Sequence, residues 1–86
     1  MKFVLNKCFG GFRLSDWAEE QMGCSEPERN DPKFVTLVTN HFTEVSGFCA
    51  ALVVVEIPDD STDYEIDEYD GYESITYVVD GKIYHA

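Results

Sequence analysis

Carboxylates are the most abundant groups in this chain that are able to bind cations or exchange protons, and they are concentrated in one stretch. Nine of the 17 acidic residues lie within residues 56–73. An EF-hand calcium loop needs a glycine at its sixth position. A loop counted from Asp59 has Tyr64 at that position, and a loop counted from Asp63 has Glu68. The acidic stretch therefore does not predict a calcium site.

Cysteine and histidine side chains form no recognisable catalytic or metal-binding pattern either. There is no C-x-x-C pair, and no zinc-ligand or nucleophile–base spacing, among Cys8, Cys24, Cys49, His41 and His85. We therefore expect a protein without enzymatic activity, cofactor or metal. The odd number of separated cysteines indicates free thiols, as in a cytoplasmic chain. Cys49 lies in an apolar run and is expected in the core, whereas Cys8, close to a predicted helix start, is either structural or reactive.

Tyrosines alternate with acidic residues in the C-terminal half of the chain. Tyrosine provides contact area at a low entropic cost, which suits protein recognition, but it is also a common strand residue. If this stretch binds a protein, the residues predicted to make the contact are Glu65, Asp67, Glu68, Tyr69, Asp70, Tyr72 and Glu73.

The net charge of the chain is distributed unevenly. Residues 1–33 contain five cations and six acids, a net charge of −1, whereas residues 34–86 contain one cation, Lys82, and eleven acids, a net charge of −10. A field of this sign repels nucleic acids and anionic membranes and attracts basic proteins. The simpler explanation is solubility alone. We expect a basic protein as the partner, with no direct binding to nucleic acid or membrane.

The segment Asn6–Ser15 combines two adjacent glycines with two phenylalanines, a cysteine and two cations. Gly10-Gly11 permits a sharp bend, so one interpretation is a structural connection between a strand and a helix. The other is an anion-binding loop formed by backbone amides beside Lys7 and Arg13. The segment matches neither the G-x-G-x-x-G nor the Walker A pattern.

The sequence N-K-C-F-G-G-F-x-L-S at residues 6–15 resembles the start of a family of short, uncharacterised phage and prophage proteins. Two later stretches, residues 29–32 and residues 54–73, are similar to that family as well. The family often has glycine where this chain has Arg13, so the resemblance implies no role for that cation. It implies a phage context and no particular activity.

Two functions follow as hypotheses. The leading one is a non-enzymatic acidic protein, encoded by a phage, that blocks a basic nucleic-acid-binding surface of a host protein in the host cytoplasm, for example to counter a host defence. A cytoplasmic location is expected because the first apolar run is too short for a signal peptide. The alternative is a protein that binds or sequesters a small nucleotide signal through Asn6, Lys7, Gly10, Gly11, Phe12, Arg13 and Ser15.

Local patterns predict the elements that position these groups. Strands are expected at Lys2–Lys7, Phe48–Ile57, Tyr64–Tyr69, Glu73–Val79 and Lys82–His85, the second being central because it is almost wholly apolar. Helices are expected from a cap at Asp16 to Gly23, and from Pro32, after an Asp31 cap, to Glu44.

The order β-α-α-β-β-β-β predicts a single α+β domain spanning residues 1–86. We expect an antiparallel sheet of four to five strands with both helices on one face, and tyrosines and carboxylates on the other. The last hairpin is expected to form a sheet edge, where Val78, Ile83 and Tyr84 pair with a second copy to give a homodimer.

Overall fold

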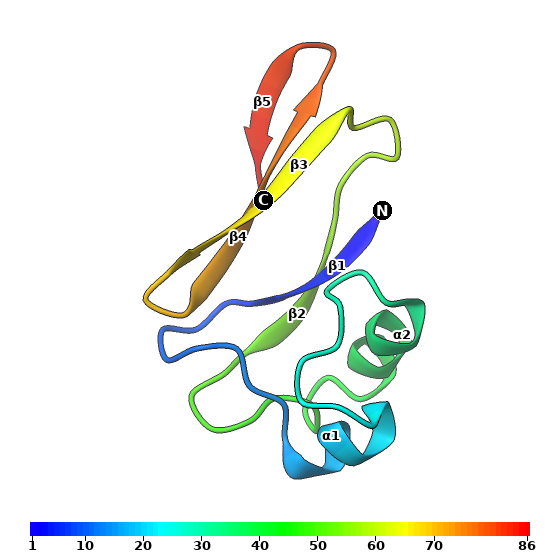
Figure 1. Ribbon diagram of the computed structural model, residues 1–86, viewed down its shortest axis with the longest axis vertical. Coiled ribbons are helices and arrows are strands. Elements are labelled where there is room, and N and C mark those ends of the chain that lie inside the picture. Colours follow the sequence, from blue (N-terminus) through cyan, green and yellow to red (C-terminus); the bar gives the residue numbers. More distant parts are fainter.

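The computed structural model describes residues 1–86 and has the predicted α+β class and element order (Figure 1). The elements are β1 (Lys2–Asn6), α1 (Asp16–Met22), α2 (Pro32–Asn40), β2 (Leu52–Glu56), β3 (Asp63–Tyr69), β4 (Tyr72–Val79) and β5 (Lys82–His85).

The strands form two antiparallel sheets rather than one. β1 pairs with β2, and β3, β4 and β5 form a separate meander in that order. Figure 1 shows the β1–β2 ribbon between the helices and the three-stranded sheet. The apolar run Phe3-Val4-Leu5 explains this arrangement, because successive strand residues point to opposite faces and both faces of β1 are therefore apolar.

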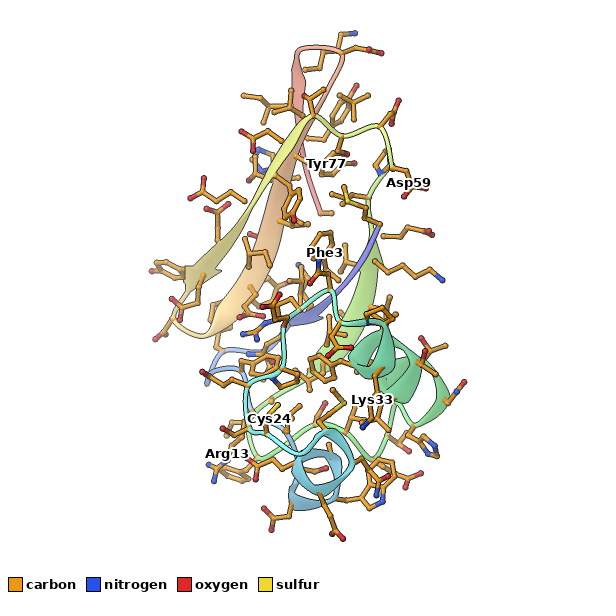
Figure 2. The ribbon with its side chains drawn as sticks, turned by 45° about the vertical axis from the view of Figure 1, so that its right-hand side comes forward. Phe3, Arg13, Cys24, Lys33, Asp59 and Tyr77 are labelled. Atoms are coloured by element: carbon orange, nitrogen blue, oxygen red, sulfur yellow. The ribbon has the colours of Figure 1, made fainter.

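Each face of the ribbon has its own hydrophobic core. Val4 and Leu52 pack against the helices with Leu14, Ala18, Phe34, Val38 and Val45. Phe3 and Leu5 pack against the three-stranded sheet with Ile57 and Ile75, and Figure 2 shows Phe3 between β1 and that sheet. β1 is thus the strand that is buried on both faces, and because neither strand of a two-stranded ribbon is central, the prediction of a central strand at residues 48–57 is wrong.

A turn shortens the β2 strand at its start. Ala50 donates its N–H to the Gly47 carbonyl at 3.1 Å, and Cys49 adopts a left-handed conformation with φ 62°. Residues 47–50 therefore form a turn, and β2 begins at Leu52. Cys49 is exposed, so its predicted place in the core is also wrong.

The helix boundaries differ from the predicted ones at two ends. Ser15, not Asp16, caps α1, because its hydroxyl accepts a hydrogen bond from Ala18 N–H at 3.1 Å. α2 starts at the predicted Asp31–Pro32 cap but ends at Asn40. The chain turns there and buries Val45, whose carbonyl accepts the Ser15 N–H at 2.8 Å. A tertiary contact thus ends the helix before the periodic pattern does.

Two-residue turns join the strands of the meander. Asp70-Gly71 joins β3 to β4 and Asp80-Gly81 joins β4 to β5, and all four residues have positive φ, as a type I′ turn requires. Successive residues along β3 and β4 point to opposite faces of the sheet, one face toward the β1–β2 ribbon and the other toward solvent.

Candidate protein-binding surface

The outer face of the three-stranded sheet carries a row of carboxylates. Ile66 and Tyr64 face the ribbon, where Tyr64 lies 5.0 Å from Phe3 between ring centroids, so Asp63, Glu65 and Asp67 point outward from β3. Alternate residues of an antiparallel strand lie about 6.8 Å apart. We call these three exposed side chains the carboxylate row. No lysine or arginine occurs in β3 or β4 to neutralise them.

A short hydrogen-bonded chain crosses this face from one edge strand to the other. The Thr76 hydroxyl on β4 contacts Asp67 Oδ2 at 2.8 Å and His85 Nδ1 at 3.1 Å. Because a hydroxyl has one proton, it donates to the carboxylate and accepts from the imidazole. These contacts orient the Asp67 carboxylate while leaving it exposed.

An aromatic cluster lies at the turn end of the same sheet. Phe9, from the glycine-rich loop, lies 6.5 Å from Tyr69 and 5.2 Å from Tyr72 between ring centroids. Phe9 is 61% exposed and Tyr69 is 78% exposed. The Lys7 ammonium lies 5.0 Å from the centre of the Tyr72 ring. Exposed aromatic rings of this kind are typical anchors of protein interfaces.

The structure brings together the two segments that sequence reasoning treated as alternative sites. Gly10 N–H donates to the Asp70 carbonyl at 3.2 Å. A Cβ atom built on Gly71 would lie 2.2 Å from the Gly11 nitrogen, so the hairpin turn and the glycine-rich loop are in direct backbone contact. Gly71 therefore has a structural role, because only a residue without a side chain allows this approach. Gly10 is a second such position, since an added Cβ atom there would lie 2.7 Å from the Cys49 carbonyl oxygen.

A buried polar junction of Asn6, Arg29 and Glu73 connects the sheets. Asn6 is fully buried, and its backbone N–H donates to Glu73 Oε1 at 2.9 Å. In its side chain, Nδ2 donates to the carbonyls of Cys8 and Gly71, and Oδ1 accepts the Ala51 N–H. Arg29 donates to both Glu73 oxygens, at 3.3 and 2.8 Å. We call these three residues the polar junction.

Glu73 is consequently not a surface residue. It is 6% exposed, and its carboxylate is fully engaged within the chain. The prediction that Glu73 contacts a partner is wrong, because the inward-facing side of β4 lies against β1 at this position. The other predicted contact residues, Glu65, Asp67, Glu68, Tyr69, Asp70 and Tyr72, are exposed.

The predicted ligand-binding groups of the loop are engaged or separated. The Ser15 hydroxyl caps α1 and donates to the Glu44 carbonyl at 2.6 Å, and Phe12 packs edge-on against Phe34. Lys7 lies against Tyr72, whereas Figure 2 shows Arg13 at the helical end of the molecule. The two cations therefore do not converge on one anion.

Partial burial lowers the pKa of Lys7 below its ordinary value, and the negative charge of Glu73 opposes this shift. The ammonium also donates to the Ala86 carbonyl at 3.3 Å. Lys7 is therefore a cation held against the sheet rather than one extended toward solvent.

Sequence reasoning missed two residues of this region, Phe9 and Arg29. Phe9 borders the glycine pair, but its neighbours Tyr69 and Tyr72 are more than fifty residues away in the chain. The partner of Arg29 is 44 residues away, and the Arg29 guanidinium also lies 3.4 Å from the Phe12 ring centre. No local pattern signals such contacts.

No family model, no curated protein sequence and no solved structure matches this chain. Neither α1 nor α2 has the length and apolar character needed to cross a membrane.

Proposed function

We propose that this chain is a non-enzymatic acidic binding protein, encoded by a phage, that covers a basic nucleic-acid-binding surface of a host protein in the host cytoplasm. The observation that carries the proposal is the exposed carboxylate row on an edge strand, in a sheet face that contains no lysine or arginine from β3 or β4.

The arrangement of charge supports a protein partner of opposite sign. The chain has a net charge of −11, and a regularly spaced row of negative charges on one face presents a basic surface with a pattern comparable to a nucleic-acid backbone. The aromatic cluster of Phe9, Tyr69 and Tyr72 adds apolar contact area at the end of this face. Charge attracts the partner, and the aromatic rings supply desolvated contacts.

The hypothesis of a small-molecule site in loop 6–15 stays a prediction, and the geometry does not favour it. Its donors at Asn6, Gly10 and Ser15 bond within the chain.

The proposal is tested by capturing proteins from a nuclease-treated host lysate on the immobilised chain at low salt. We expect enrichment of basic, nucleic-acid-binding proteins that are eluted by added duplex DNA or by raised salt, because both compete for the same charges. Absence of such proteins, or capture that is indifferent to salt and DNA, would contradict the proposal.

Two double variants that change the net charge equally distinguish an effect of the carboxylate row on capture from an effect of the net charge of the chain. Glu65→Lys with Asp67→Lys reverses part of the carboxylate row, whereas Glu20→Lys with Glu26→Lys alters exposed residues in and after α1. We expect the first pair to reduce capture at least about tenfold, since each close charge pair in an interface contributes about 1.5 kcal/mol or more. Equal losses in both variants would show that net charge alone acts.

A further inference from the structure

The β3 strand has one unpaired edge. The sheet order is β3-β4-β5, so β3 pairs with β4 along one side and with no strand along the other. A free edge of seven residues is a template for an added strand.

The register identifies which backbone groups face this free edge. Tyr69 and Tyr72 flank the two-residue Asp70-Gly71 turn and are therefore a hydrogen-bonded pair. Because pairing alternates along an antiparallel ladder, the odd-numbered residues of β3 bond to β4. The N–H and C=O groups of Tyr64, Ile66 and Glu68 point to the free side.

The same alternation holds on the next strand of the sheet. Ile75 of β4 exchanges hydrogen bonds with Ala86, at 3.0 and 2.8 Å, on the side away from β3. On β3, the Tyr64 N–H is taken by its neighbour Asp63 Oδ1 at 2.9 Å. The amides of Ile66 and Glu68 are therefore the donors that β3 offers to an added strand.

A groove lies beside this edge and provides space for a fourth strand. It has a volume of about 350 Å³ and runs between β3 and the loop before α2; its lining residues are Phe3, Pro27, Glu28, Arg29, Asn30, Tyr64 and Ile66. The exposed Tyr64 ring and the partly buried Ile66 side chain of this lining are suited to the inward-facing side chains of an added strand.

The charges of β3 determine which strand fits its edge. A second copy of β3 would place carboxylates opposite carboxylates, which is destabilising. A segment with Lys or Arg at alternate positions would place its cations beside Asp63, Glu65 and Asp67, at Cβ separations of about 4.5–5.5 Å. The acidic edge thus opposes self-pairing and favours a basic strand.

We infer that the free edge of β3 binds an extended basic segment of the partner protein as an antiparallel fourth strand of the sheet. This inference rests on the proposed function and specifies how the partner is held. The antiparallel direction follows from the sheet itself, in which every pair is antiparallel, and antiparallel pairing is slightly more stable per residue.

The test uses the full chain, labelled with ¹⁵N, and a synthetic peptide in which lysine alternates with threonine or valine. When the peptide lysines lie on the outer face beside Asp63, Glu65 and Asp67, its threonines and valines lie opposite Tyr64, Ile66 and Glu68. Their backbone N–H groups then point toward β3 in an antiparallel pair. One peptide is N-methylated at those positions, and a control peptide carries the same number of N-methyl groups on its lysines. Charge and methylation are therefore identical in the two modified peptides.

We expect the unmodified and lysine-methylated peptides to slow hydrogen exchange of the Ile66 and Glu68 amides at least about tenfold. The peptide methylated at threonine and valine should bind about tenfold more weakly, because it lacks the donors for the ladder. Equal affinity of both modified peptides, or unchanged Ile66 and Glu68 exchange on binding, would overturn the edge pairing while leaving an electrostatic partner surface intact.

Absence of binding by all three peptides at low salt would also overturn the edge pairing. The proposed function is judged separately, by the capture of basic proteins and its dependence on Glu65 and Asp67.

Discussion

Glu65 and Glu73 come from the same acidic stretch, but the fold places them in opposite surroundings. Glu65 is exposed on the outer face of β3 beside two further carboxylates. Glu73 is buried on the inner face of β4, where it accepts hydrogen bonds from Arg29 and from the backbone of Asn6. One carboxylate is available to a partner, and the other connects the two sheets.

The contrast between Glu65 and Glu73 shows that the net charge of the acidic stretch does not indicate which of its carboxylates are able to bind a partner. A desolvated carboxylate is stable only with donors around it, and the polar junction supplies them. A solvated carboxylate needs no such donors, and its negative charge attracts cationic groups of an approaching partner. Burial on the inner face of the sheet therefore gives a carboxylate of this stretch a structural role, whereas exposure on the outer face leaves it available for binding.

The largest expected effect comes from the backbone contact beside the polar junction. Gly71→Ala would place a methyl group 2.2 Å from the Gly11 nitrogen, in a residue with φ 90°. We expect a loss of about 3 kcal/mol or more in the free energy of unfolding, since backbone clash adds to left-handed strain. Urea denaturation followed by circular dichroism measures it.

Gly81→Ala is the matched control for this substitution. Gly81 occupies the same position of the second hairpin turn, with φ 75°, and an added Cβ would meet nothing within 4 Å. Its cost should be only the left-handed strain, about 1 kcal/mol. Similar losses for both variants would mean that the contact between the glycine-rich loop and the hairpin is not tight.

A second pair of variants compares the two carboxylates directly. Glu73→Gln leaves the Arg29 guanidinium, whose side chain is 21% exposed, without its counter-charge, and we expect a loss of about 3 kcal/mol. Glu65→Gln relieves repulsion from Asp63 and Asp67 and should change stability by less than about 0.5 kcal/mol, in the stabilising direction. Destabilisation by Glu65→Gln as large as that by Glu73→Gln would invalidate the comparison.

The smallest expected effect concerns self-association through the other edge of the sheet. β5 contains no carboxylate, and Ile83 is 67% exposed on it. We expect two copies to pair there through Ile83 and Tyr84, with Val78 of the middle strand β4 beside Ile83. The pairing should be tighter at high salt because each chain carries a charge of −11. Sedimentation velocity at low and high salt measures this, with Ile83→Lys as the dissociated control. A monomer at both salt concentrations would contradict the pairing.

Part of the fold and of the candidate site could be predicted from local signals. The partial alternation in residues 64–69 predicted a strand that carries carboxylates and tyrosines, and most residues of the observed strand β3 are exposed, as a binding surface requires. The burial of Glu73 could not be predicted, because its donors at Asn6 and Arg29 are 67 and 44 residues away. The same holds for the aromatic cluster, which joins Phe9 to a distant hairpin.

The sequence by itself determined the elements and their turns: the Asp31–Pro32 helix start, the Gly23 helix end and the two Asp-Gly hairpins. These features depend on the conformations open to single residues, so a few neighbours suffice to specify them. Only the tertiary structure decided that the strands form two sheets, that β1 is buried on both faces, and that one carboxylate of the acidic stretch is buried. These outcomes depend on which apolar faces pack against one another. Because the packed faces belong to segments far apart in the chain, no local sequence pattern specifies them.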